Sequence, residues 1–75
     1  PNPTNALLYI RFTNALREDL HVEVFSLNGQ LLQRQRFNHA NTELSLNLSE
    51  YPAGVYLVRL VSGDAALTER IVLQK

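Results

Sequence analysis

The 75-residue sequence predicts a single all-β domain, built as a sandwich or a small barrel. Apolar and polar residues alternate with a period of two along most of the chain, which puts apolar side chains on one face of each strand. Residues that favour turns separate these alternating segments at spacings of roughly 8–12 residues, as in sandwiches and barrels. No segment keeps the period of a helix, and Leu16–Leu20 could form one helical turn at most.

The alternation predicts six strands. A clear example contains Leu44, Leu46 and Leu48, which alternate with polar residues. The segment 55–61 is apolar almost throughout, so we expect it to be covered on both faces or flanked on both edges. In chain order, the expected strands lie near residues 7–12, 20–27, 30–37, 43–48, 55–61 and 66–73, and residues 1–5 could add a short edge segment as a seventh.

Turn and loop residues fill the gaps between these strands. Asn28 and Gly29 both tolerate positive φ, so they predict a two-residue type I′ hairpin turn. A second tight turn is expected at residues 62–64, and polar loops are expected at 14–19 and 38–42.

A corner between the sheets is expected near residues 51–54. Pro52 and Gly54 interrupt the strand pattern there, as expected where a chain crosses from one sheet to the other. Tyr51 and Tyr56 flank this corner. Since a corner tyrosine often holds nearby backbone through its hydroxyl group, a structural role is predicted for both.

Composition and charge exclude several classes of function. Seven basic residues balance seven acidic ones, so the chain has no general attraction for nucleic acid or for anionic lipid. No apolar run approaches the roughly 18–20 residues that span a bilayer, and membrane insertion is not expected. Cysteine is absent, which excludes disulfides and thiol chemistry and leaves the redox compartment open.

The titratable residues do not assemble into an active site. His21 and Glu23 share one strand face and could supply two metal ligands, but a metal site normally needs three or four, so a solvated face is the better interpretation. His39 is expected at the surface of a loop. No sequence pattern joins a nucleophile, a base and an oxyanion donor. We therefore expect no enzyme activity, no metal and no cofactor.

Two arginines on a single strand are the remaining candidates for a binding site. Arg34 and Arg36 share one face of the strand near residues 30–37, and the glutamines between and beside them share the other. Two arginines do not make a nucleic-acid patch. A solvated strand is the main interpretation, and a contact with an anion or a glycan is the alternative.

Three separated stretches together resemble a known family. They are the opening Pro1-Asn2-Pro3-Thr4-Asn5, the middle segment Val24–Leu32, and the end of the chain, which comprises Leu48–Leu60, with the pattern L-x-x-x-P-A-G-V-Y-x-V-x-L, and Glu69–Lys75. In this combination the chain resembles the C-terminal sorting domain of type IX (Por) secretion cargo, of type A, over essentially all its residues. The matching positions are Pro1, Asn2 and Pro3, then Gly54, Val55, Tyr56, Leu57, Val58, Arg59 and Leu60, then Arg70, Ile71, Val72, Leu73, Gln74 and Lys75. One departure is Glu69, where the family often has a second basic residue.

The resemblance implies an immunoglobulin-like antiparallel sandwich of six to seven strands. Residues 1–75 would be one sorting domain at the end of a larger secreted protein, and the first residue, Pro1, fits a start inside a precursor. The cargo would cross the periplasm and be recognised by the type IX machinery at the outer membrane. A surface sortase would then remove the domain and attach the cargo to lipopolysaccharide at the cell surface.

A physical rationale places the signal at the end of the chain. A terminal strand at an open sheet edge exposes unpaired peptide groups, and another strand can pair with them. We therefore expect the machinery to recognise Ile71–Lys75 in this way, or through the face that these residues share with segment 55–61. The same open edge leaves room for a homodimer formed by exchange of an end strand.

Two other functions remain open from the sequence. The domain could be retained on its protein as a binding module for lipopolysaccharide, glycan or a partner protein. Such a module needs an aromatic platform, for which Tyr9, Phe25 and Phe37 are the available exposed residues. A purely structural spacer is the third possibility, and it would tolerate a position in the middle of a chain.

Overall fold

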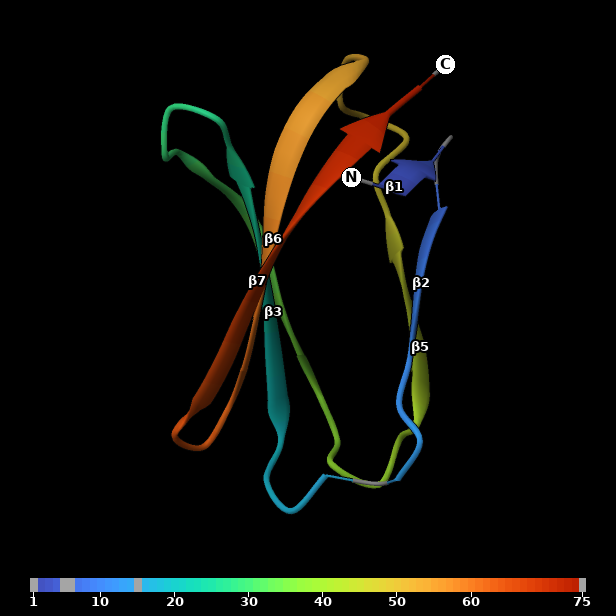
Figure 1. The fold of residues 1–75 in the computed structure, drawn as a ribbon, viewed down its shortest axis with the longest axis vertical. Coiled ribbons are helices and arrows are strands. Elements are labelled where there is room, and N and C mark those ends of the chain that lie inside the picture. Colours follow the sequence, from blue (N-terminus) through green and yellow to red (C-terminus); the bar gives the residue numbers. More distant parts are fainter. Residues whose placement is uncertain (1, 5–6, 15, 75) are drawn as a thin grey trace.

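The computed structural model describes residues 2–4, 7–14 and 16–74, and these residues form two β-sheets packed face to face (Figure 1). The larger sheet has the strand order β1-β7-β6-β3-β4, and the smaller sheet pairs β2 with β5. Neighbouring strands are antiparallel, except that β1 runs parallel to β7. The strands are β1 (Asn2–Thr4), β2 (Leu7–Arg11), β3 (Leu20–Ser26), β4 (Leu31–Phe37), β5 (Glu43–Asn47), β6 (Gly54–Ser62) and β7 (Ala65–Leu73).

This architecture confirms the all-β, immunoglobulin-like sandwich, and the two separate sheets exclude the barrel alternative. The expected strand boundaries agree with the observed ones to within one or two residues. The segment Leu16–Leu20, which could have formed one helical turn at most, contains none, because Leu20 begins β3 and Arg17 and Glu18 form a bend. The segment 55–61 lies in β6, which β3 and β7 flank on both edges as expected.

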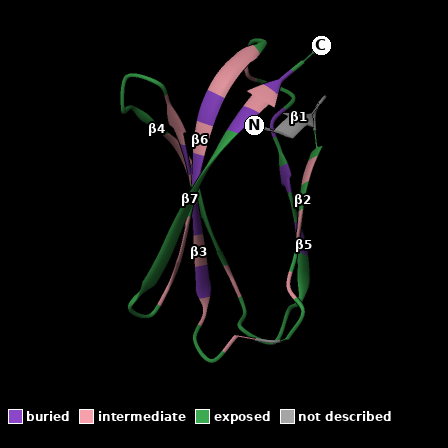
Figure 2. Ribbon diagram, viewed as in Figure 1, coloured by how far each residue is buried: buried purple, intermediate pink, exposed green. Residues whose placement is uncertain are grey.

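The core lies between the two sheets and follows the predicted alternation. In β3, Leu20, Val22 and Val24 are buried, while the residues between them are half-buried on the outer face (Figure 2). Full burial of one such aliphatic side chain contributes about 1.5–3 kcal/mol. The buried cluster contains Leu20, Val22, Val24, Leu44, Leu46, Leu48, Tyr56, Val58, Ile71 and Leu73.

The turn between β3 and β4 differs from the prediction. Asn28 does not have positive φ, so the turn is not type I′. The Gly29 N–H donates to the Ser26 carbonyl at 3.0 Å, and the Ser26 N–H donates to the Gln30 carbonyl at 2.9 Å. These two bonds enclose a three-residue loop in which Gly29 alone adopts a left-handed conformation, with φ of 92°. Such a loop uses one residue more than a type I′ turn, and both turns accept an Asn-Gly pair, which is why the sequence did not separate them.

The predicted second tight turn is confirmed between β6 and β7. Ser62 pairs with Ala65, so the loop consists of Gly63 and Asp64. Gly63 has φ of +57°, which suits a glycine at the first central position of a type II′ turn. A Cβ atom at Gly63 would also collide with the Glu18 carboxylate. The left-handed backbone conformation is therefore the reason that glycine is favoured here, because the exposed Glu18 side chain can move away from a Cβ atom.

Candidate recognition surface

The fold brings the three groups of matching motif positions into neighbouring strands (Figure 1). The opening residues form β1, the central stretch forms β6, and the terminal stretch forms the end of β7 between them. Val72 illustrates the arrangement, because it pairs with Pro3 on one side and with Val55 on the other. Of the matching positions, only Pro1 and Lys75 lie outside the described residues.

The pairing with β1 contradicts one expectation about the chain end. Ile71–Leu73 were expected at an open sheet edge, but β1 pairs with these residues in parallel and β6 pairs with them on the other side. Ile71 and Leu73 are also almost completely buried, at 2% and 1% exposure. Strand addition at this part of β7 is therefore blocked while β1 is in place. Pro3 is compatible with this position because β1 is an edge strand.

The motif residues that point inward build the core. Tyr56, Val58, Ile71 and Leu73 are all buried. The Tyr56 hydroxyl group donates to the Pro52 carbonyl at 2.6 Å, which ties β6 to the corner that precedes it. This bond confirms the structural role predicted for Tyr56.

Tyr51 also stabilises this corner, through contacts with Tyr56 and Gln33. Its ring lies 5.7 Å from the Tyr56 ring, between centroids. Its hydroxyl group accepts a hydrogen bond of 3.0 Å from the Gln33 side chain, and the same amide donates to the Asn47 carbonyl at 3.3 Å. The inward-facing Gln33 thereby links β4 to the end of β5.

The motif residues that point outward form an apolar surface. Val55, Leu57 and Val72 are half-buried on the outer face of the larger sheet. Phe25 lies directly opposite Leu57 and is also half-buried. We call these four residues the outer patch. Leu31, which pairs with Phe25 and is 48% exposed, continues the outer patch toward β4.

The stretches that carry the resemblance contain all five of these residues, but sequence reasoning did not place Phe25 and Leu31 on one surface with Val55, Leu57 and Val72. Phe25 was noted as an exposed aromatic residue and as part of the segment Val24–Leu32. Phe25 lies at a position of β3 where the alternation predicts an outward, polar side chain, as at His21 and Glu23. An apolar residue in that phase indicates a second apolar face at one end of the strand.

Charged side chains occupy the other half of the same face. The Glu23 carboxylate lies 3.5 Å from the Arg34 guanidinium and 3.2 Å from that of Arg59, and its side chain is only 15% exposed. Arg36 lies 3.7 Å from Asp19. Each of these arginines therefore faces a carboxylate, which argues against a free basic surface. Arg70, beside Leu57 at the border of the outer patch, forms no ion pair with any described residue.

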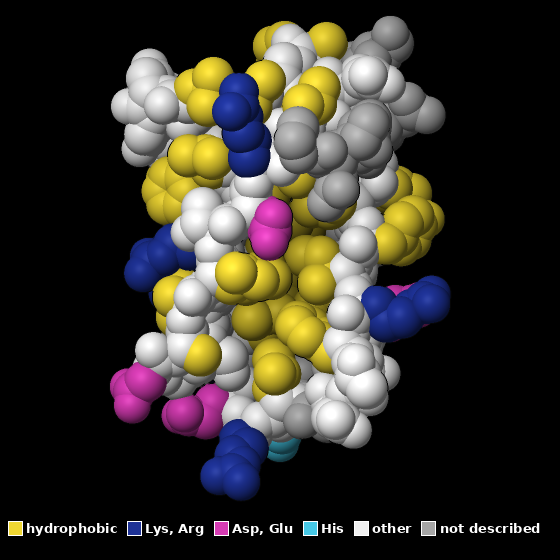
Figure 3. All heavy atoms as spheres, in the orientation of Figure 1, with side chains coloured by type: hydrophobic (Ala, Val, Ile, Leu, Met, Phe, Trp, Pro, Cys, Tyr) yellow, Lys and Arg dark blue, Asp and Glu magenta, His cyan; other side chains and the backbone are white. Residues whose placement is uncertain are grey.

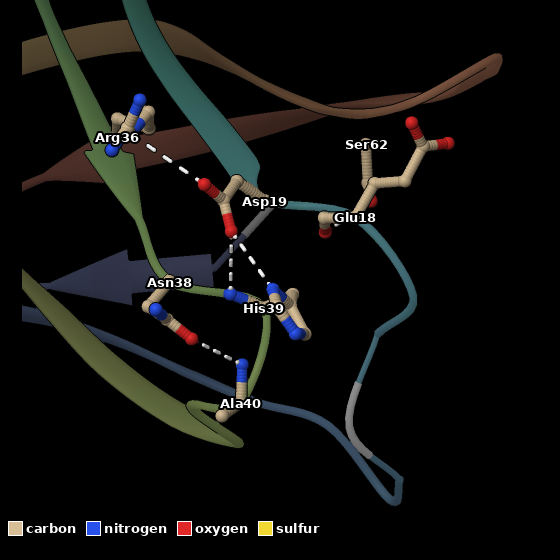
Figure 4. A network of polar contacts seen from close by, with 7 residues as sticks. All are labelled: Glu18, Asp19, Arg36, Asn38, His39, Ala40 and Ser62. Carbon is tan, nitrogen blue, oxygen red and sulfur yellow. Dashed lines mark hydrogen bonds and ion pairs between the residues drawn. The ribbon is translucent and has the colours of Figure 1, made fainter.

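Asp19 organises a polar network at the end of the sandwich away from the outer patch (Figure 4). Its carboxylate accepts a hydrogen bond of 3.0 Å from the His39 backbone and lies 3.0 Å from His39 Nδ1. The side chain of Asn38 accepts a 2.8 Å bond from the Ala40 N–H within the same loop. The bonds from His39, assisted by Arg36, lower the pKa of Asp19 below its ordinary value.

The lowered pKa of Asp19 predicts a loss of stability in acid. The carboxylate is favoured in the folded state, so its contribution is complete above the unfolded pKa of about 3.9 and is lost as the pH falls through the folded pKa. We expect the difference in unfolding free energy between the wild type and Asp19→Asn to be largest above about pH 5 and to shrink below pH 4. Urea unfolding measured above pH 5 and again below pH 4 tests this expectation, and a constant difference would contradict the assignment.

The described residues contain neither a cluster of metal ligands nor a membrane-spanning helix. They contain no group of three or more His, Cys, Asp or Glu residues that could hold a metal ion. Glu23, the candidate partner of His21, is instead engaged by two arginines. Within the described ranges no helix is long and apolar enough to cross a membrane.

Comparison with known families agrees with the resemblance seen in the sequence. A family model described as a secretion system C-terminal sorting domain matches residues 1–74. No curated protein matches the chain. The match therefore includes β1, β6 and β7, the three strands that meet beside the outer patch.

Proposed function

Because the chain belongs to the family of secretion-system C-terminal sorting domains, we propose that the outer patch is the surface through which it is recognised. The domain is a sorting signal of type IX secretion, and this function implies contact with the secretion machinery, an upstream cargo and a secreted or cell-surface location. The proposal adds that the machinery contacts the domain at the outer patch. It also takes residues 1–75 as one domain at the end of a larger protein.

One observation carries this proposal. The family motifs lie far apart in the sequence but meet in the adjacent strands β1, β7 and β6. Their inward residues are used by the core, whereas Val55, Leu57 and Val72 give the outer face an apolar character that the fold does not require. An apolar surface bordered by Arg70, which forms no ion pair with a described residue, is typical of a protein interaction site.

A transplant experiment tests the sorting function. Residues 1–75 are fused to the C-terminus of a periplasmic reporter in a bacterium that has a type IX system, and to the middle of the same reporter as a control. We expect the reporter outside the cell only with the C-terminal fusion. Equal secretion of both fusions would favour a spacer, and retention of both in the periplasm would contradict the sorting function.

The later steps of sorting are also part of the proposal. After export, a surface sortase separates the domain from the cargo and attaches the cargo to the cell surface. Mass spectrometry of the mature surface protein tests this step, because peptides from β6 and β7 should be missing from it. Retained peptides would instead favour a module that stays on its protein.

The geometry gives little support to a retained glycan-binding module. Tyr9, 67% exposed, lies on β2 in the smaller sheet, whereas Phe25 lies on β3 in the larger sheet. Phe37 packs against the core. The three aromatic residues therefore do not form a common platform for a sugar ring.

A further inference from the structure

A groove runs along the side of the sandwich between β2 and β7. Its volume is 430 Å³, and Leu8, Ile10 and Phe12 line it from the smaller sheet. Figure 3 shows hydrophobic side chains lying in a hollow between the two sheets, with an acidic side chain beside them. From the larger sheet the groove is lined by Val58, Leu60, Leu67, Glu69 and Ile71, and Tyr9 and Arg11 complete it.

Free backbone edges border this groove. β1 pairs with Ile71–Leu73 only, so no described strand pairs with the outer edge of β7 over Ala65–Arg70. The hairpin closes on the pair Ser62–Ala65 through a two-residue loop. In such a hairpin, every second residue from Ala65 onward directs its N–H and C=O groups to β6. The N–H and C=O groups of the residues in between, Ala66 and Thr68, therefore point to the open edge.

The opposite side of the sandwich shows that this openness is not a general property of the fold. A hollow of 380 Å³ lies there between β4 and the end of β5. Gln33 crosses it and binds the Asn47 carbonyl and the Tyr51 hydroxyl group. Among the described residues, no corresponding side-chain hydrogen bond joins residues 8–11 of β2 to β7.

We propose that the groove between β2 and β7 accepts an extended peptide strand that carries alternate apolar side chains and one basic residue. The unpaired edge of β7 selects a polypeptide, because only another backbone offers a regular row of donors and acceptors. The apolar floor selects apolar residues at every second position of that strand. Glu69 selects the basic residue, because its carboxylate lies in the groove and has no ion pair with any described residue.

This binding site is distinct from the outer patch. Leu67 and Glu69 face the groove, whereas Arg70 and Val72 belong to the other face of β7. The site also replaces the expected strand addition at Ile71–Lys75 with one at the preceding half of the same strand. It does not depend on the proposed sorting function, and its test uses the domain alone.

The test is a titration of the 75-residue domain with the capped peptide Thr-Val-Thr-Lys-Thr-Val-Thr, followed by amide chemical shifts. The shifts are expected to change at residues 65–70 and 8–12. A peptide with Glu in place of Lys is expected to bind about fivefold more weakly, in line with one partly exposed ion pair. Glu69→Lys should reverse this preference, whereas the control Glu50→Lys, in the hollow on the other side, should not.

Thr68→Pro tests the backbone contact separately. It removes an edge N–H without removing a bond of the sheet, so the domain should fold and bind neither peptide. If this variant does not fold, the reversed peptide preference expected of Glu69→Lys still tests the proposal. The proposal is overturned by shifts confined to other residues or by the absence of a charge preference. It is also overturned by concentration-dependent shifts at residues 65–70 that the peptide cannot displace, since these would mean that a second copy occupies the edge.

Discussion

Ile71→Ala is expected to lower the free energy of unfolding by about 2–5 kcal/mol. Ile71 is 2% exposed and belongs to the buried core between the two sheets, so the lost side chain leaves a cavity in that core. A domain of this size has a total stability of roughly 4–11 kcal/mol. The variant should therefore melt at least about 10 °C below the wild type or fail to fold at growth temperature.

Val72→Ala is the matched control for this prediction. Val72 is the next residue of β7, it is only half-buried, and it faces the outer patch. Its truncation is expected to cost about 1 kcal/mol or less. Thermal unfolding of the two variants checks the assignment of faces, and equal losses of stability would contradict it.

The double substitution Leu57→Thr with Val72→Thr is expected to reduce secretion about tenfold or more while the domain stays folded. Threonine retains a high β propensity, so the strands are kept while two apolar side chains leave the centre of the outer patch. A loss of about 1.4 kcal/mol in docking is enough for a tenfold weaker complex. Secretion of a cargo fusion measures the effect, and circular dichroism of the isolated domain verifies its fold.

Val61→Thr is the control for the double substitution. Val61 is half-buried on the same face of β6, but it lies opposite His21, in the charged half of the sheet. Its substitution should leave secretion unchanged. Normal secretion of the Leu57/Val72 variant, or an equal defect with Val61→Thr, would remove the outer patch from the recognition process.

Deleting the last five residues is less informative than these substitutions. The deletion removes Ile71 and Leu73, both nearly fully buried, together with the whole contact to β1. An unfolded signal and a signal without its docking surface would both block secretion. Only substitutions on the outer face separate recognition from folding.

The sequence predicted those parts of the fold that depend on local pattern. Alternation located most of the strands, since a half-buried strand repeats its exposure every second residue, and the continuous apolar run at 55–61 located β6. Alternation also separated inward from outward residues, as for Ile71 and Val72. The turn at Asn28-Gly29 was assigned to the wrong type because the same two residues suit two loop lengths.

The local sequence pattern did not predict contacts between residues that lie far apart in the sequence. The pairing of Asn2 with Ile71 joins the two ends of the chain, and nothing near Ile71 reveals that its edge is occupied. The same limit applied to Phe25, which joins the outer patch only because β3 lies beside β6. The groove could not be predicted for the same reason, because it forms between β2 and β7, which belong to different sheets.

The parallel pairing of β1 with β7 has a mechanical consequence. Tension applied to the two ends of the domain pulls β1 backward and β7 forward along the same line, so their three residue pairs are loaded together in shear. A force acting on β7 alone would instead open the hairpin with β6 one bond at a time. The domain therefore resists being drawn out by its two ends more than it resists being unzipped from its last strand.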